Sequence, residues 1–414
     1  MQVINERVAG LDVHKKSVTA CVRTPDTRAS KTGRRRSQIK KYGTFANDLE
    51  ALREWVASEG VTLVVMEATG VYWKPVWYAL EGFVELMLVN PRHVKQVPGR
   101  KTDISDAEWL ARLAECGLLS ASFVPPPAIR QLRDVTRYRT RLVQQRASEV
   151  QRIDKLLEDT GIKLTSVASD TLGVSARLML EALIGGESDP NRLAELAKGR
   201  LRAKLGDLRL ALRGRFGEHH RVMLRVQLDH IDHLDAAIGA LDDRVDELMA
   251  PFAVLRDLLD TVTGIGKRAA EVIIAEIGVD MDVFVTAAHL ASWAKICPGN
   301  NESAGKRRRG GTGQGNPWLR SVLVECAWAA ARSKDTYLSS QFWRIAGRRG
   351  KKRAAVAVAH SILVIVYHVL STRQPYQDLG GDYFASRVDP EARTRQLVSQ
   401  LEKLGHKVIL EPAA

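Results

Sequence analysis

The sequence predicts an α/β N-terminal domain, a helical middle region and a mostly α-helical C-terminal domain. Over residues 1–125, short apolar runs typical of strands alternate with amphipathic helical patterns. Over residues 126–255, apolar residues recur every three or four positions in two long stretches, which indicates long helices of coiled-coil type. Over residues 256–375, helical patterns surround a glycine-rich loop, and residues 376–414 form a less ordered tail. The prolines at 125–127 mark the first boundary.

The net charge of +14 and the pI of about 9.7 indicate a polyanionic partner, most often nucleic acid. Lys and Arg fall in three blocks, within residues 34–41, 306–309 and 348–353, which favours phosphate contacts. The four cysteines are scattered, which indicates a reducing compartment and no zinc site. The apolar stretch Ala354–Leu370 falls short of the roughly 20 residues of a membrane span. We therefore expect a cytoplasmic protein with no membrane contact, in which this stretch is a buried helix.

The N-terminal domain is expected to be a mixed sheet with helices packed against it. Its predicted order is three strands, a helix, a strand, a helix, a strand and a closing helix. A tight turn after Val13 joins the first two strands. The segments are residues 8–16 and 17–24, Gln38–Phe45, Asn47–Glu59, Val61–Glu67, Val71–Gly82, Val84–Asn90 and a helix that contains Asp103 and Asp106.

Four acids of this domain fall at strand ends and on the closing helix: Asp12, Glu67, Asp103 and Asp106. The last two are three residues apart and would share a helix face. Carboxylates that converge on one point repel each other, and divalent metal ions relieve that repulsion. Two such ions can stabilise the attacking and leaving oxygens of a phosphodiester. Taken singly, Asp12 fits a solvent-facing strand acid, Glu67 a surface strand end and Asp103 a helix cap.

The middle region contains two long helical patterns, Ala128–Leu157 and Leu224–Phe252. They fit an antiparallel pair within one chain as well as a contact between chains, since the second pattern is close to a heptad seam. Short helices are expected over residues 161–205, either as an insertion or as a nucleic-acid contact. A spacer and dimerisation arm is the simplest interpretation of the whole region.

A Gly-Ile-Gly turn, Gly264–Gly266, separates two helical patterns and resembles a helix-hairpin-helix. In that motif, the amides of the turn and the start of the second helix meet a phosphate without reading base sequence. Gly264, Gly266 and Lys267 would make this contact. An ordinary turn between two helices explains the pattern equally well.

A long glycine-rich loop lies between Pro298 and Pro317, and loops of this length are commonly functional or disordered. Ser303 precedes the cations Lys306, Arg307, Arg308 and Arg309. A serine hydroxyl needs a base or a polarised target to become a nucleophile. Neighbouring cations would hold a phosphate and offset developing negative charge. On composition alone, Ser303 is an ordinary loop serine.

Several motifs resemble the transposases of an insertion-sequence group called bridge recombinases. GLDVHK, MEATG, VNP and KTDISDA resemble their N-terminal domain, which has an RNase H fold similar to Holliday-junction resolvases. The resemblance assigns its Asp–Glu–Asp–Asp set to Asp12, Glu67, Asp103 and Asp106. The C-terminal domain of the group has a serine loop and a GN..LR segment, which Ser303, Gly305, Lys306, Gly315, Asn316, Leu319 and Arg320 match. Ala304 departs from the pattern, since many members have glycine there.

The resemblance implies an RNA-guided DNA transposase. Ser303 would form a phosphoserine link to DNA, aided by Mg²⁺ (or Mn²⁺) held by the four acids. The expected partners are target and donor DNA, a structured non-coding guide RNA and further copies of the chain in a dimer or tetramer, in the nucleoid-containing bacterial cytoplasm. The candidate nucleic-acid contacts are Lys101, Gly264, Gly266, Lys267, Lys306, Arg307, Arg308, Arg309, Asn316 and Arg320.

Two other functions fit the residues. In a metal-dependent, structure-selective nuclease for junction DNA, the four acids would cut and Ser303 would be structural. In a non-catalytic RNA- or DNA-binding protein, binding would be sensitive to salt and no strand would break. Replacing Ser303 by alanine separates the first of these from a serine recombinase, because only the recombinase would lose cleavage.

Overall fold

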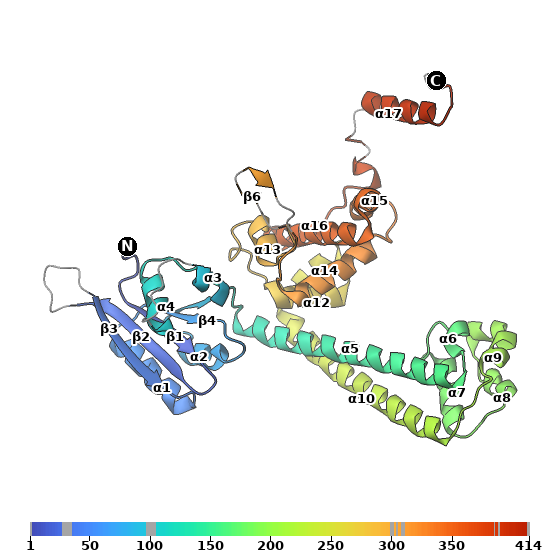
Figure 1. Cartoon of the computed structure of the whole chain (residues 1–414), viewed down its shortest axis with the longest axis horizontal. Coiled ribbons are helices and arrows are strands. Elements are labelled where there is room, and N and C mark those ends of the chain that lie inside the picture. Colours follow the sequence, from blue (N-terminus) through green and yellow to red (C-terminus); the bar gives the residue numbers. More distant parts are fainter. Residues whose placement is uncertain are drawn as a thin grey trace. The chain divides into compact units, whose positions relative to one another are not determined.

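The computed structural model describes residues 2–26, 35–96, 105–298, 302–303, 305–307, 311–384, 386–387 and 390–411. The chain divides into two compact units, Met1–Val124 and Pro125–Ala414. The first is mixed α/β and the second is almost entirely helical (Figure 1). Each unit has its own hydrophobic core.

A five-stranded sheet forms the centre of the first unit, in the order β3-β2-β1-β4-β5. β1 pairs antiparallel with β2 and parallel with β4, which confirms the expected mixed sheet. β1 and β4 have apolar residues at both odd and even positions, so both faces of each strand are apolar. This explains why the two strands are central and covered on both faces. The strands are β1 (Val8–Val13), β2 (Val18–Pro25), β3 (Arg35–Tyr42), β4 (Leu63–Glu67) and β5 (Glu85–Val89).

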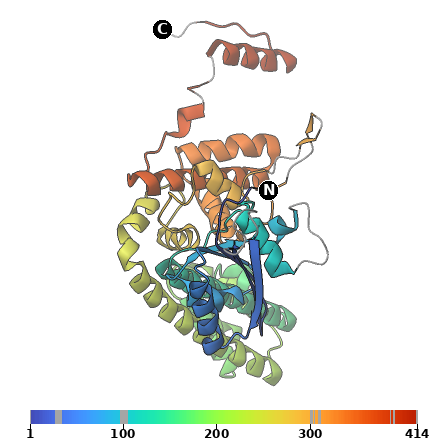
Figure 2. The same ribbon diagram turned by 90° about the vertical axis from the view of Figure 1, so that its left-hand side faces the viewer.

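Helices cover both faces of this sheet (Figures 1 and 2). One core lies between the sheet and the helices α1 and α2, and a second core lies between the sheet and α4. The helices of this unit are α1 (Ala46–Ser58), α2 (Trp73–Leu80), α3 (Pro91–Gln96) and α4 (Asp106–Glu115).

Gly10 lets α4 lie directly on β1, because a Cβ at this position would collide with the backbone of Ala107 and Ala111. We expect Gly10→Ala to lower the free energy of unfolding by about 1–3 kcal/mol, the usual cost of overpacking a close contact. Urea unfolding of the purified protein measures it. Gly239→Ala is the matched control: this residue is exposed within a helix with open space around it, so alanine there should stabilise by about 0.5–1 kcal/mol.

The second unit begins with two long helices, α5 (Pro127–Thr160) and α10 (Glu218–Met249), which pack against each other. Ion pairs join Arg139 to Asp242 and Arg146 to Asp235, so the helices run antiparallel. The leucine-rich seam of α10 is buried within this chain, at Leu224, Leu228, Ile231, Leu234 and Val245. Of the two arrangements considered for this seam, the structure shows the antiparallel pair within one chain, and a contact between subunits through it stays a prediction.

Short helices close the far end of this pair, as expected for residues 161–205. Their apolar faces share one core with the ends of α5 and α10. Leu180, Leu193 and Leu208 are fully buried in it. The helices are α6 (Leu164–Val167), α7 (Val174–Ile184), α8 (Pro190–Glu195), the 3-10 helix η1 (Gly199–Lys204) and α9 (Leu205–Ala211).

The C-terminal part of the unit is a bundle in which α16 contacts α11, α13, α14 and α15. α16 is the one helix of the described residues that is long and apolar enough to cross a membrane, and half of its apolar window is buried in this bundle. The elements are η2 (Ala250–Phe252), α11 (Ala253–Asp260), α12 (Lys267–Ile277), α13 (Ala287–Trp293), β6 (Glu302–Ser303), β7 (Lys306–Arg307), α14 (Pro317–Ala330), α15 (Tyr337–Arg349), α16 (Lys351–Thr372), η3 (Gly381–Phe384) and α17 (Pro390–Lys403).

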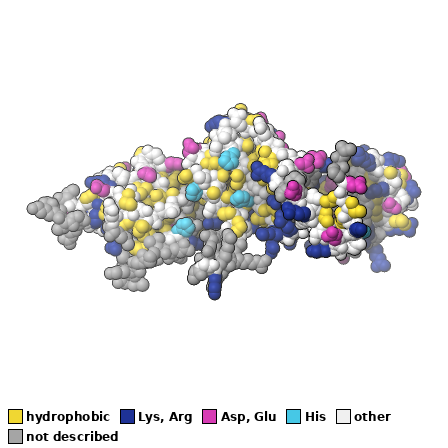
Figure 3. Space-filling model, turned by 90° about the horizontal axis from the view of Figure 1, so that it is seen from above, with side chains coloured by type: hydrophobic (Ala, Val, Ile, Leu, Met, Phe, Trp, Pro, Cys, Tyr) yellow, Lys and Arg dark blue, Asp and Glu magenta, His cyan; other side chains and the backbone are white. Residues whose placement is uncertain are grey.

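Cationic, acidic and hydrophobic side chains are interspersed on the face that Figure 3 shows. The net charge of +14 does not form one continuous cationic surface there. On this face the cations lie in local groups. The four cysteines are all free thiols.

Candidate functional site

Asp12 and Glu67 lie at the carboxyl ends of two neighbouring parallel strands and project from the same face of the sheet. β1 and β4 pair with Leu11 opposite Met66, and the two acids are the next residues in that register. Leu11 and Met66 point into the core under α1 and α2. Because side chains alternate along a strand, Asp12 and Glu67 both point to the α4 side.

The direction of α4 brings a third acid to this end of the sheet. Near its start, Ala107 lies against Gly10 of β1; at its end, the carbonyl of Glu115 accepts a hydrogen bond of 2.8 Å from the amide of Ile4, which precedes β1. α4 therefore runs antiparallel to β1, and its N-terminus lies toward the end that carries the two strand acids (Figure 1). Asp106 is the first residue of α4.

α4 starts later than the sequence suggests. Ser105 is its N-cap: the backbone of this residue is extended, and its hydroxyl accepts a 3.2 Å hydrogen bond from the amide of Glu108. The prediction that Asp103 and Asp106 share one helix is therefore wrong, because the extended Ser105 separates them. The capping role considered for Asp103 belongs to Ser105. Asp103 itself lies outside the described residues, as does Lys101.

The chemistry of this acid end fits a hard divalent cation. The side chain of Asp12 is 29% exposed, and its Oδ2 lies 3.1 Å from Nε2 of the exposed His14. Carboxylate oxygens on adjacent strand ends are the donors that Mg²⁺ and Mn²⁺ prefer. Among the described residues, no three His, Cys, Asp or Glu side chains are close enough to hold a metal ion. A complete site would therefore need a further ligand beyond Asp12 and Glu67.

Ser303 lies in a two-stranded hairpin made by β6 and β7, with Ser303 paired opposite Lys306. Gly305, in the two-residue connection, has a φ of 73°, a conformation that glycine adopts without strain. A further bridge between Pro298 and Thr312 closes the base of this segment, which we call the serine loop (residues 298–312). Lys306 is exposed, so its ammonium group is available to an anion beside Ser303.

The GN..LR residues hold the base of the serine loop. Asn316 caps α14, its Oδ1 accepting hydrogen bonds from the amides of Trp318 (3.1 Å) and Leu319 (3.2 Å). Arg320 donates to the hydroxyl of Thr312 at 2.8 Å. Gly315 is required because a Cβ there would collide with the carbonyl of Ala294. These internal contacts favour a structural role for Asn316 and Arg320 over the direct nucleic-acid contact that we predicted.

A buried acid that the sequence analysis did not single out ties this base to α5. The carboxylate of Glu276 is fully buried and accepts two hydrogen bonds of 2.7 Å from Arg137. It also accepts one of 2.5 Å from the side-chain amide of Asn316. Nε of Arg133 lies 3.6 Å from Oε2 of Glu276. Burial lowers the pKa of the Arg133 guanidinium to about 10. The available signal was an acid inside the apolar run EVIIAEIG.

The Gly-Ile-Gly turn does connect two helices, α11 and α12, but its surroundings do not suit a phosphate. Gly264 packs against α14, where a Cβ would collide with the carbonyl of Cys326. Lys267, at the start of α12, pairs with Asp246 at 3.0 Å, and this contact lowers the pKa of the Asp246 carboxyl. The ammonium of Lys267 therefore already has an acid as its partner. The geometry therefore favours an ordinary helix–helix turn for Gly264, Gly266 and Lys267.

The first basic block serves the fold of its own unit. Arg35 pairs with Glu115, Arg36 lies 3.6 Å from Glu59, and the ammonium of Lys40 sits over the ring of Trp55 at 4.6 Å. These cations are already partnered, so they add little to a nucleic-acid surface. In the second block, Arg308 and Arg309 lie outside the described residues, and the structure describes only the backbone of Arg307.

Comparison with known proteins gives a consistent result for both units. Residues 9–162 match the transposase family of the IS110 DEDD type, and residues 256–344 match the transposase family IS116/IS110/IS902. The chain is 27% identical over 336 residues to the transposase for insertion sequence element IS1111A of Coxiella burnetii, covering 78% of this chain and 81% of that protein. It is 24% identical over 298 residues to y4qE of Sinorhizobium fredii, whose name classes it as a transposase, covering 70% and 63% of the two lengths.

Proposed function

Because the chain belongs to the IS110 family of transposases, enzymes of DNA transposition, we propose that it cuts and rejoins DNA through Ser303 with the help of divalent metal ions. The first unit would be an RNase H-like domain in which Asp12, Glu67, Asp103 and Asp106 hold Mg²⁺ or Mn²⁺. The second unit would contribute the nucleophile.

The observation that carries this proposal is the placement of Asp12 and Glu67. They extend from adjacent strand ends to one face of the sheet, and Asp106 opens the helix whose N-terminus lies toward the same end. A divalent cation bound there would neutralise the phosphate and stabilise charge on the oxygens that attack and leave.

The proposed bond exchange is a transesterification. The Oγ–P bond from Ser303 to a DNA phosphate forms as the P–O bond to one deoxyribose oxygen breaks. The serine proton passes, through a base or water, to that departing oxygen, so the number of phosphodiester bonds is unchanged. Lys306, opposite Ser303 in the hairpin, would hold the phosphate oxygens.

The proposed substrates are target and donor DNA, aligned by a structured non-coding RNA, and the proposed active form is a dimer or tetramer. The net charge of +14 supports a polyanionic partner without distinguishing RNA from DNA. Purifying the protein from cells that carry its flanking DNA, then sequencing the nucleic acid bound to it, tests the RNA. One discrete RNA encoded beside the gene supports it, and a heterogeneous mixture contradicts it.

Ser303→Ala tests the nucleophile. With labelled element-end DNA and Mg²⁺, we expect the wild-type chain to form a covalent adduct that survives denaturing electrophoresis and is removed by protease. Ser303→Ala should form none and should lose strand cleavage. If Ser303→Ala still cuts while Asp12→Asn does not, the protein is a metal-dependent nuclease and the serine mechanism is wrong.

A further inference from the structure

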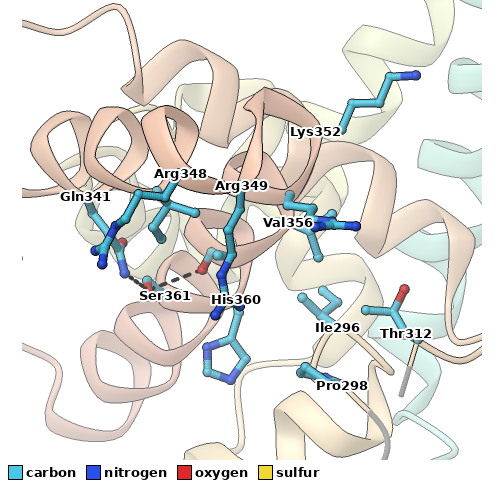
Figure 4. Close-up of a pocket in the computed structure, with 14 residues that line it drawn as sticks. Ile296, Pro298, Thr312, Gln341, Arg348, Arg349, Lys352, Val356, His360 and Ser361 are labelled. Atoms are coloured by element: carbon cyan, nitrogen blue, oxygen red, sulfur yellow. Dashed lines mark hydrogen bonds between the residues drawn. The ribbon is translucent and has the colours of Figure 1, made fainter. Parts of the chain in front are cut away.

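A basic groove of about 1010 Å³ runs between α15, α16 and the two ends of the serine loop. Four cations line it: Arg348, Arg349, Lys352 and Arg353, all on or beside the turn that joins the two helices. Pro298 and Thr312, the pair that closes the serine loop, form its opposite wall (Figure 4). The groove therefore adjoins the segment that carries Ser303.

These four side chains are exposed, and within the described part of the chain none of them pairs with an acid. Most arginines of α5 behave differently: Arg137, Arg139 and Arg146, for example, each bind a carboxylate. Figure 4 shows Arg349 extending along the groove toward His360, whereas Lys352 reaches away at the rim. A group of unpaired cations on a concave surface attracts an extended anion.

The floor of the groove is apolar with a few polar groups. Ile296 is buried, and Val356 and Ile345 are half-buried along its length. Gln341 donates a 2.9 Å hydrogen bond to the hydroxyl of Ser361, but its side-chain oxygen has no hydrogen-bond donor among the described residues. Burial lowers the pKa of His360, so its ring is neutral at pH 7 and adds no charge to the floor.

We propose that this groove binds unpaired nucleotides of the DNA substrate beside the phosphate that Ser303 attacks. This rests on the function proposed above. The cationic rim matches the phosphates, and the apolar floor matches the faces of unstacked bases.

A duplex or an acidic peptide fits this groove less well. The bases of a duplex are stacked and paired inside the helix, so a duplex would meet the rim with its backbone but leave the apolar floor uncovered. An acidic peptide carries no flat apolar group to fill the floor beside each charge. Only a single strand presents closely spaced phosphates together with base faces.

The test measures the binding of short dye-labelled oligonucleotides to full-length protein that also carries Ser303→Ala, so that no chemistry enters. Arg349→Gln with Arg353→Gln should weaken binding of single-stranded DNA roughly tenfold. The slope of log affinity against log salt concentration should fall by roughly 1.4, the change expected for two lost phosphate contacts with a single strand. Arg332→Gln with Lys334→Gln, exposed cations of the same unit outside the groove, is the matched control and should leave both values unchanged.

A second variant, Ala357→Phe, fills the floor without removing a cation. It should weaken binding of single-stranded DNA while a hairpin duplex with the same number of phosphates still binds as before. Circular dichroism and a thermal melt of each variant establish that it is folded. Should Ala357→Phe fail to fold, Val356→Gln repeats the test with a side chain of similar size.

The outcomes are distinct. Unchanged binding of single-stranded DNA by the Arg349→Gln and Arg353→Gln double variant overturns the proposal that the groove binds DNA. An equal loss for duplex and single strand overturns the preference for unpaired nucleotides and leaves a general contact with the backbone. A larger loss for RNA than for DNA of the same sequence overturns the assignment to DNA. None of these results depends on adduct formation, so the proposed role of the groove is tested separately from the serine mechanism.

Discussion

Replacing Asp12 by asparagine is expected to lower DNA strand cleavage by about a thousandfold or more, while the first unit keeps its fold. The carboxylate would hold a divalent cation that stabilises the negative charge of the transition state by several kcal/mol. Each factor of ten in rate corresponds to about 1.4 kcal/mol of activation free energy. The asparagine side chain would retain the shape of the aspartate and lose its charge. Cleavage of labelled element-end DNA, measured with Mg²⁺ and with Mn²⁺, checks this.

In the absence of metal, the same substitution should not lower the thermal stability of the protein. Asp12 and Glu67 extend to the same face from adjacent strand ends, so removing one charge relieves repulsion between them. Asp12→Asn should therefore not destabilise the protein in a thermal melt in the presence of a chelator. Addition of Mg²⁺ should raise the melting temperature of the wild type more than that of Asp12→Asn.

The matched control is Glu50→Gln, an exposed acid on α1, which covers the other face of the sheet. This variant should cut DNA and respond to Mg²⁺ as the wild type does. Full cleavage by Asp12→Asn would contradict a catalytic role for the acid end of the sheet. It would leave a mechanism that depends on Ser303 alone, because a non-catalytic protein would not cut at all.

Replacing Glu276 by alanine is expected to lower the free energy of unfolding of the second unit by about 3–5 kcal/mol. Its fully buried carboxylate is the common partner of Arg137, Arg133 and Asn316. Without it, two partly buried guanidinium groups lose the acid that they share, and breaking a buried ion pair from one side costs energy on this scale. Urea unfolding followed by circular dichroism measures it.

The control for Glu276 is Glu247→Ala. Glu247 pairs with Arg244 at 2.7 Å on the exposed surface of α10, and its removal should cost less than about 1 kcal/mol because solvent screens such a pair. The side-chain amide of Asn316 also loses its acceptor in Glu276→Ala. The serine loop should then be cut faster by trypsin under native conditions. Equal stability losses for the two variants would contradict a buried network.

The order of elements in the first unit follows from the sequence by itself. Apolar runs predicted strands where β1, β2, β4 and β5 lie. A strand that is buried on one face has apolar residues at every second position, and a strand that is buried on both faces has an unbroken apolar run. Element ends were less accurate: the third strand is Arg35–Tyr42 rather than Gln38–Phe45. The hydroxyl of Ser105, not a periodic pattern, determines where α4 begins.

The candidate acids also came from the sequence, because an acid that ends an apolar strand is unusual. Only the tertiary structure decided that Asp12 and Glu67 share a face and that α4 runs toward them. Strand register and helix direction depend on contacts between residues far apart in the chain, such as Gly10 with Ala107.

The sequence did not predict which cations are paired with acids, because a lysine or arginine appears the same in the sequence whether it is paired or not. The sequence offered three basic blocks as equals. The fold pairs Arg35 with Glu115 and Lys267 with Asp246, whereas Arg349 and Arg353 line an open groove. Glu276 likewise looked like one more helix acid. Its burial among arginines from another helix, determined by tertiary packing alone, makes it the acid that links α5 to the base of the serine loop.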